Sequence, residues 1–311
     1  MTLYTAARTS FNKRIQQVEK RIGNTPLFKV SHVYNHPNIT IYAKLEWHQL
    51  GESVKARPAF QIIKHAIEEG WLGAGQHLLD ATSGNTGIAY ASIGAALGIP
   101  VTLFLPENAS EERKDILKRL GANLILTSQL EGTDGAQREA KALYEKHPDR
   151  YYYADQYSNE QNWRAHYETT ANEIWKQTQG KISHFVAGLG TTGTFVGTSR
   201  RLRELNPQIQ LTALQPNNPL HGLEGWKDLE TAIVPKIYDK HIADQFLEVD
   251  TIAAYEMVKK VALQERLLIS PSAAANLLGA IEVATQIEEG VIVTTFADNA
   301  EKYGEVMKRL F

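Results

Sequence analysis

From about residue 78 to the end of the chain, short apolar runs alternate with segments of helical periodicity. The apolar runs are HLLDATS, VTLFLP, ANLILT, SHFVAG, IQLTALQ and VIVTTFA, and the helical segments between them include GNTGIAYASIGAALG, SEERKDILKRLG and residues 134–146. Strands that are separated by helices pair in parallel, with helices on both faces of the sheet. The chain is therefore predicted to be an α/β protein.

Length and charge narrow the possible partners. The chain has 311 residues, 43% of them hydrophobic, which is enough for one large core or two medium ones, and we expect two lobes. The formal net charge is −2 and like charges do not cluster, which argues against nucleic acid or a membrane surface as a partner. A small molecule or a second copy of the chain is expected instead.

The chain has no cysteine, which excludes disulfides, thiolate nucleophiles and cysteine-ligated metals. The N-terminal segment lacks the apolar core of a signal peptide, so a cytoplasmic protein is expected. No metal site is predicted from the ten histidines, and His166 and His221 are the two expected near a cleft.

Two loops combine glycine with hydroxyl side chains. Residues 82–87, TSGNTG, follow the strand HLLDA and open a helix, and residues 188–194, GLGTTGT, follow SHFVA in the same way. Helix N-termini at the carboxyl ends of parallel strands present free backbone N–H groups. Each loop is therefore a candidate cradle for a phosphate or a carboxylate.

The second loop also fits the dinucleotide pattern GxGxxG. That pattern requires an acidic residue at the end of the next strand, where it would hold the ribose. The next strand here, IQLTALQ, ends in Gln215, so the sequence favours a phosphate cradle over a nicotinamide site.

A basic pair lies close to the start of a predicted helix, because Lys55 and Arg57 precede Pro58, a residue suited to the first helical position. Two interpretations are open for Lys55. It is either a solvated side chain, or it turns inward, where burial, the helix dipole and Arg57 would lower its pKa. A lysine tuned in that way can form a Schiff base. Together with the two cradles, it would suit pyridoxal phosphate and an amino acid.

Four motifs of the chain resemble those of a known enzyme family. SVKARPA, TSGNTG, LGTTGT and the DQY to EIW region, in this order, resemble the fold type II pyridoxal phosphate enzymes, most closely the cysteine synthases (O-acetylserine sulfhydrylases) of the B-isoform type. The resemblance runs from GNTPL at 23–27 to the last strand. It implies a smaller mobile lobe, residues 49–159 with part of 1–26, and a larger lobe of residues 27–48 and 160–311.

The resemblance also implies roles for individual residues. Lys55 matches the Schiff-base lysine that also acts as acid and base, Asn85 the partner of the cofactor's phenolic oxygen, and Ser272 the hydroxyl that faces the pyridine nitrogen. The substrate carboxylate would be held by Thr82, Ser83, Gly84, Thr86 and Gln156. The cofactor phosphate would be held by Gly190, Thr191, Thr192, Gly193 and Thr194.

The implied reaction is a β-replacement. A homodimer would make L-cysteine from O-acetylserine or O-phosphoserine and sulfide, through a bound α-aminoacrylate, with Lys55 removing and returning the α-proton. Two alternatives stay open: condensation like that of cystathionine β-synthase, or another β-replacement on a serine derivative, and a catalytically retired binding or regulatory protein.

Some positions depart from the family pattern. Glu52 and Ala56 replace the usual glycine and aspartate around the lysine. Glu52 is either a charge that acts on Lys55 or on the nucleophile, or a solvated loop acid. Residues 216–245 lack clear periodicity and are predicted to form a flap at the entrance of the site.

Overall fold

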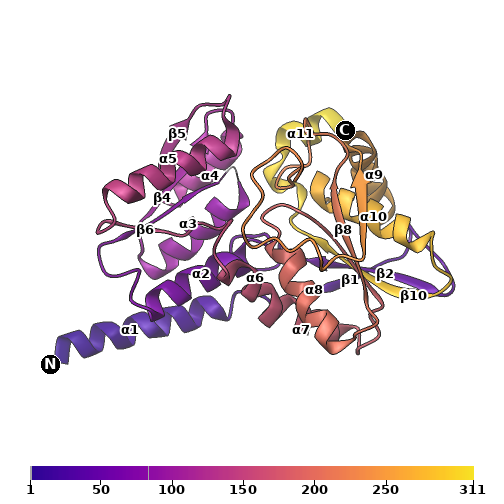
Figure 1. Ribbon diagram of the computed structural model, residues 1–311, viewed down its shortest axis with the longest axis horizontal. Coiled ribbons are helices and arrows are strands. Elements are labelled where there is room, and N and C mark those ends of the chain that lie inside the picture. Colours follow the sequence, from indigo (N-terminus) through magenta and orange to yellow (C-terminus); the bar gives the residue numbers. More distant parts are fainter. Residues whose placement is uncertain (1, 83) are drawn as a thin grey trace.

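The computed structural model describes residues 2–82 and 84–311, and it contains two separate sheets (Figure 1). The large sheet has six strands in the order β1-β2-β10-β7-β8-β9, and the small sheet has four in the order β5-β4-β3-β6. The pair β1 and β2 is antiparallel, and the other strand pairs among the described residues are parallel. This arrangement confirms the predicted α/β fold with two mostly parallel sheets.

The strands of the two sheets come from different parts of the chain. The large sheet contains β1 (Leu27–Val30), β2 (Ile39–Leu45), β7 (His184–Gly188), β8 (Gln210–Pro216), β9 (Gln245–Val249) and β10 (Gly290–Phe296). The small sheet contains β3 (His77–Ala81), β4 (Val101–Pro106), β5 (Asn123–Thr127) and β6 (Tyr151–Tyr153). The small sheet is therefore built within one continuous segment, whereas the large sheet draws on the chain before and after it.

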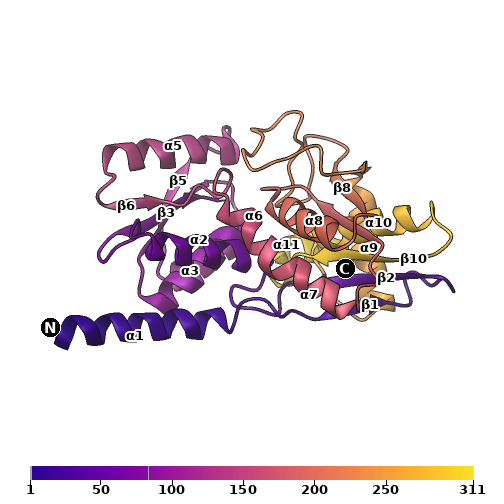
Figure 2. The same cartoon turned by 60° about the horizontal axis from the view of Figure 1, so that its bottom comes forward.

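Helices cover both faces of each sheet (Figures 1 and 2). Around the small sheet lie α1 (Thr2–Glu19), α2 (Ala56–Glu68), α3 (Asn85–Leu97), α4 (Glu111–Arg119) and α5 (Gly132–Lys146). The remaining helices are α6 (Gln161–Ala165), the π-helical turn η1 (His166–Thr170), α7 (Ala171–Gln177), α8 (Gly193–Leu205), α9 (Thr251–Gln264), α10 (Pro271–Ala284), the short 3₁₀ turn η2 (Ala300–Lys302) and α11 (Gly304–Leu310). Among the described helices, none combines the length and the apolar character needed to cross a membrane.

The continuous apolar runs arise because each central strand is buried on both faces. In β4, Leu103 joins the core on the side of α2 and α3, while its neighbour Phe104 joins a second core that includes Ala136 of α5. In β7, Phe185 packs with Phe195 of α8, and the next residue points to the opposite core, against α10. Successive side chains of a strand point to opposite faces, so a strand covered twice must be apolar at every position.

The structure differs from the sequence prediction at the start of α2. The helix begins at Ala56, with Lys55 as its N-cap, so Pro58 is the third helical residue rather than the first. Proline is tolerated there because the first four N–H groups of a helix have no partner within the helix. Helix α4 follows its prediction closely: Ser110 caps it by accepting a hydrogen bond from Arg113 N at 3.4 Å, and Gly121 follows it with a φ of +80°.

A buried ion network connects α2 to the large sheet and to α7. The guanidinium of Arg57, which is 1% exposed, donates to the Glu46 carboxylate at 2.7 and 2.8 Å and to the Glu173 carboxylate at 2.7 and 2.9 Å. The Lys44 amine also donates to Glu173, at 2.7 Å. Burial raises the pKa of Glu173, but Arg57 and Lys44 outweigh it and bring that pKa down to about 2. The network therefore holds ionised groups that are largely shielded from water, with Arg57, Lys44 and Glu46 buried and Glu173 14% exposed.

We predict that Arg57→Met lowers the free energy of unfolding of the apoprotein by about 3–5 kcal/mol, because it leaves buried carboxylates without their counter-charge. The matched control is Lys64→Met on the same helix, which removes a more exposed ion pair with Glu19 and should cost at most about 1 kcal/mol. Urea unfolding followed by circular dichroism measures both. Equal losses in the two variants would contradict the prediction.

Candidate active site

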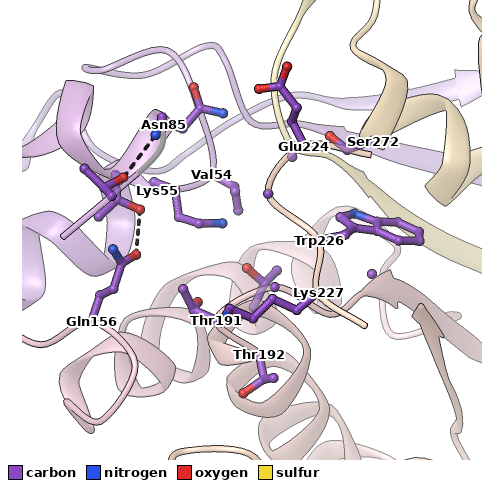
Figure 3. A pocket seen from close by; sticks show the side chains of 18 of the residues that line it. Val54, Lys55, Asn85, Gln156, Thr191, Thr192, Glu224, Trp226, Lys227 and Ser272 are labelled. Atoms are coloured by element: carbon purple, nitrogen blue, oxygen red, sulfur yellow. Dashed lines mark hydrogen bonds between the residues drawn. The ribbon is translucent and has the colours of Figure 1, made fainter. Parts of the chain in front are cut away.

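A pocket lies between the two sheets, at the carboxyl ends of β3, β7 and β10 (Figure 3). It encloses about 150 Å³. The structure brings to it most of the residues singled out in the sequence: Lys55, Thr82, Gly84, Asn85, Thr86, Gln156, Gly190, Thr191, Thr192, Thr194 and Ser272. Gly193 is buried just behind the wall, and Ser83 lies outside the described residues.

Lys55 faces the pocket from the N-terminus of α2. Burial lowers the pKa of its amine, against the opposing effect of the Asp298 and Glu46 carboxylates. The prediction that Arg57 also lowers this pKa is wrong. Its guanidinium is turned away from the pocket, and its charge is neutralised by Glu46 and Glu173. Desolvation is thus the main cause of the lowered pKa.

The loop after β3 is tied to Gln156. The Thr86 hydroxyl donates to Gln156 Oε1 at 2.7 Å, and Gln156 Nε2 donates to the carbonyl of Ala81 at 2.8 Å. Gly84 N donates to the Thr82 hydroxyl at 3.1 Å. These contacts hold hydroxyl and amide groups at the N-terminus of α3, where an anion is favoured.

The loop after β7 has the shape of a phosphate cradle. A Cβ atom at Gly190 would collide with the carbonyl of Gly225, and one at Gly193 with the side chain of Asn162, so only glycine fits at either position. The Thr192 hydroxyl is buried and has no hydrogen-bond partner among the described residues. An unpaired buried hydroxyl at the N-terminus of α8 fits a phosphate ligand.

Ser272 lies in the first turn of α10, 4% exposed, with its hydroxyl 3.2 Å from that of Ser270. The group facing the pocket here is a neutral hydroxyl rather than a carboxylate. The donor set as a whole fits pyridoxal phosphate: a buried amine, a phosphate cradle and a neutral hydrogen-bonding group on one cavity.

The predicted flap, residues 216–245, contains no helix or strand from residue 217 to 244. It contributes Glu224, Trp226 and Lys227 to the pocket wall. Two ion pairs join it to helices beside the small sheet: Glu224 with Arg113 of α4, and Lys227 with Asp134 of α5 at 3.0 Å. The flap therefore closes over the pocket by bridging the two halves of the molecule.

Sequence reasoning missed several pocket residues. Arg113 and Tyr303 line the pocket, and the Arg113 guanidinium stacks on the Tyr303 ring with a distance of 4.8 Å to its centroid. Asp298 accepts a hydrogen bond from Asn85 Nδ2 at 2.7 Å. Its position, directly beyond the strand VIVTTFA, was the available signal, since ligand sites gather at the carboxyl ends of parallel strands.

The histidines take no direct part in the pocket. His166 is fully buried, with Nε2 3.3 Å from the Thr194 hydroxyl, and burial lowers its pKa, so it supports the phosphate loop as a neutral ring. His221 is half-buried in the flap and accepts a hydrogen bond from Leu223 N. His32 and His36 have a spacing of four residues but lie in the loop between β1 and β2. No group of three or more potential metal ligands occurs among residues 2–82 and 84–311.

Glu52 is an exposed loop residue. It adopts a left-handed conformation with a φ of +51°, and its backbone carbonyl accepts a hydrogen bond from Lys302 Nζ at 2.7 Å. It is not among the charges that act on Lys55. This placement favours the interpretation of Glu52 as a solvated loop acid.

Comparison with known proteins identifies the family of the chain. Residues 18–298 match the family described as pyridoxal-phosphate dependent enzymes, and the chain belongs to that family. Within it, the chain is 46% identical to the cysteine synthase of Aquifex aeolicus over 94% of this chain and 92% of the relative. It is 35% identical to cysteine synthase B of Escherichia coli over 92% of this chain and 93% of the relative.

Solved structures give the same result. The cysteine synthase of Entamoeba histolytica superimposes with a TM-score of 0.88 at 32% identity, covering 94% of this chain and 90% of the other. The O-acetylserine dependent cystathionine beta-synthase of Helicobacter pylori superimposes with a TM-score of 0.86 at 32% identity, covering 92% and 96%.

Behind the loop after β3 lies a buried acid, Asp80. Its carboxyl group accepts hydrogen bonds from Ala81 N at 2.8 Å and from Gln156 N at 3.3 Å. Burial raises its pKa to about 7, with the charge of Asp155 adding to the effect and the backbone hydrogen bonds opposing it. The group that supports Gln156 from behind therefore titrates near neutral pH.

We predict that Asp80 makes stability depend on pH. An aspartic acid in the unfolded chain loses its proton near pH 4, whereas the folded protein keeps this one up to about pH 7. The unfolding free energy of the wild type should therefore fall, relative to that of Asp80→Asn, by up to about 4 kcal/mol as the pH rises from about 4 to 7. Urea unfolding at several pH values measures the difference. Asp149→Asn, at an exposed acid, is the control, and parallel curves for wild type and Asp80→Asn would contradict the prediction.

We predict that Glu52→Gly raises the unfolding free energy by about 0.5–1 kcal/mol, because glycine relieves the left-handed strain at a smaller entropic cost. Glu139→Gly, at an exposed position within α5, should instead lower it by about 1 kcal/mol. Thermal unfolding compares the two. Substrate preference should be the same in Glu52→Gly and wild type, and a changed preference would show that the carboxylate acts on the site.

Proposed function

We propose that the protein is a pyridoxal-phosphate dependent enzyme that makes L-cysteine by β-replacement, from an activated serine and sulfide. The observation that carries the proposal is the position of the Lys55 amine, desolvated and facing the same small pocket as an anion cradle from each sheet. The similarity to cysteine synthases over nearly the whole chain supports it.

When bound, pyridoxal phosphate attaches through its aldehyde to a lysine and later withdraws electrons from the α-carbon of the amino acid. We assign its phosphate to the loop from Gly190 to Thr194, where backbone N–H groups and hydroxyls converge at the N-terminus of α8. Asn85 and Ser272 would contact its ring, and Figure 3 shows these two side chains on opposite sides of the pocket.

The substrate's carboxylate is assigned to the loop after β3. Gln156, with its amide held by Ala81 and Thr86, orients that carboxylate together with the N–H groups at the start of α3. Lys55 then lies within the same pocket to remove the proton from the α-carbon and to return it later. Its lowered pKa suits this work, because an amine must be neutral to accept a proton.

A neutral hydroxyl at Ser272 affects which reaction is favoured. A carboxylate at that position would keep the ring nitrogen protonated and stabilise a long-lived carbanion, whereas a hydroxyl does so less. Rapid loss of a leaving group from the β-carbon is then the favoured course. The flap, joined to the other half of the molecule by its two ion pairs, excludes water from that step.

Several finer features belong to the same proposal. The donor is O-acetylserine or O-phosphoserine, the enzyme is a cytoplasmic homodimer, and residues 49–159, with part of residues 1–26, form the lobe that moves as the site closes. The Helicobacter relative, described as an O-acetylserine dependent cystathionine beta-synthase, makes homocysteine the second nucleophile to test.

We predict that the holoprotein is yellow, that either donor changes its absorbance, and that sulfide restores it. Borohydride followed by peptide mapping should place the cofactor on Lys55. Lys55→Ala should lose this label and at least about 10³-fold in kcat. Lys227→Ala, at the other lysine of the pocket wall, should keep the label on Lys55. A label on another residue, or none, would refute the proposal, and a response to donor and homocysteine but not to sulfide would reassign the nucleophile.

A further inference from the structure

Asp298 is a buried carboxylate behind the pocket wall that has no role in the proposed reaction. It lies two residues beyond the end of β10, is 0% exposed, and accepts two hydrogen bonds on Oδ2 from residues of the wall, from Asn85 Nδ2 at 2.7 Å and from the Tyr303 hydroxyl at 2.8 Å. Asn85 is the first residue of α3, beside the small sheet, so the hydrogen bond spans the cleft between the two sheets.

The first consequence concerns the orientation of the Asn85 amide. An ionised carboxylate only accepts hydrogen bonds, so Asp298 binds the NH₂ end of the amide and excludes the flipped orientation. One N–H of Asn85 Nδ2 is used in this contact, and the second is free to donate to a ligand. Without Asp298, nothing among the described contacts of Asn85 would select one end of the amide over the other.

The second consequence concerns charge. Two carboxylates act on the Lys55 nitrogen, Asp298 with the larger effect and Glu46 with the smaller. The charge of Glu46 is already matched by Arg57 in the buried network. Asp298, by contrast, forms no ion pair with any residue in the described ranges 2–82 and 84–311, and its Oδ1 atom is buried without a hydrogen-bond donor there.

Two other cations lie near Asp298, and its charge acts on both Arg113 and Lys302. Arg113 pairs with Glu224 and stacks on Tyr303, and the Lys302 amine donates to the Glu52 carbonyl. His166 is neutral, because burial lowers its pKa. The charge of Asp298 therefore acts on two buried amines, those of Lys55 and Lys302, and only the Lys55 amine faces the pocket.

We propose that Asp298 is a positioning residue for the lysine-bound cofactor: it orients the Asn85 amide toward the ring and supplies the counter-charge for the Lys55 nitrogen. The proposal rests on the assignment of Lys55 as the attachment site. Protonation of the linkage nitrogen makes the carbon of the C=N bond more electrophilic, so this counter-charge would prepare that carbon for attack by the amino group of the incoming substrate.

A purely structural role for Asp298 would give a different experimental result. If Asp298 only ties β10 to α3 and Tyr303, its replacement lowers stability but does not change the electronic state of the bound cofactor. The absorbance of the holoprotein separates the two roles, because the cofactor band shifts to shorter wavelength when the linkage nitrogen loses its proton.

The first experiment uses Asp298→Asn, which keeps an acceptor for Asn85 and removes the charge. The long-wavelength band of the protonated linkage should be lost at a pH at least about one unit lower than in the wild-type holoprotein. Tyr303→Phe, which keeps the charge and removes one hydrogen bond, and Asp149→Asn, at an exposed acid, should both titrate like the wild type. If the long-wavelength band of Asp298→Asn has the same pH dependence as that of the wild type across the accessible pH range, Asp298 does not supply the counter-charge.

The second experiment tests the orientation of Asn85 through the dissociation constant of pyridoxal phosphate, measured by equilibrium dialysis. Asp298→Ala should weaken binding about tenfold in the presence of Asn85 and clearly less in an Asn85→Ala background, where only the counter-charge is lost. An equal loss of affinity in both backgrounds would overturn the proposed orientation of Asn85 by Asp298. If Asp298→Ala does not fold, Asp298→Asn still decides whether Asp298 supplies the counter-charge.

Failure of this inference is distinguishable from failure of the proposed function. A wild-type protein without a cofactor band, or with the label on another lysine, contradicts the assignment of Lys55. A normal band on Lys55 that is insensitive to residue 298 contradicts the role of Asp298 alone.

Discussion

The buried pairing of Arg57 with Glu46 and Glu173 is the interaction on which the geometry of the pocket depends. Arg57 lies two residues after Lys55 in the first turn of α2, and side chains two residues apart on a helix point in nearly opposite directions. Anchoring the guanidinium beside β2 and α7 therefore turns Lys55 toward the cleft. The same network neutralises the charge of Arg57, so that burial, rather than a neighbouring cation, becomes the main influence on the lysine amine.

Parallel strands place the rest of the site. The strands β3, β7 and β10 each end at the cleft, and each is followed by a polar segment: residues 82–87, residues 188–194 and Asp298. Glycines are required where one backbone passes close to another, as at Gly190 beside Gly225 of the flap. The site therefore follows from sheet topology combined with a few close contacts, and the flap adds ion pairs that hold its two sides together.

Local sequence signals predicted local structure well. The capping serine, the acidic first turn and the terminal glycine of SEERKDILKRLG correspond to α4 with its N-cap Ser110. The two glycine and threonine loops join strand to helix as expected, because alternating apolar runs and helix starts depend on neighbours in the chain. The predictions about Arg57 and the start of α2 were wrong because these features depend on residues that are distant in the chain. The direction of the guanidinium depends on Glu46 and Glu173, which are separated from it along the chain but adjacent in space.

The sequence by itself determined the α/β class, the alternation of strands and helices, and the two glycine and threonine loops that open helices, since periodicity and motif order are local properties that a single chain displays directly. Only the tertiary structure decided which charges meet. The contact between Asp298 and Asn85 joins residues 213 positions apart, and the pairing of Arg113 with Glu224 joins residues 111 apart. Such pairs leave no periodic trace in the sequence, because the energy of a buried charge depends on distance and desolvation rather than on position along the chain.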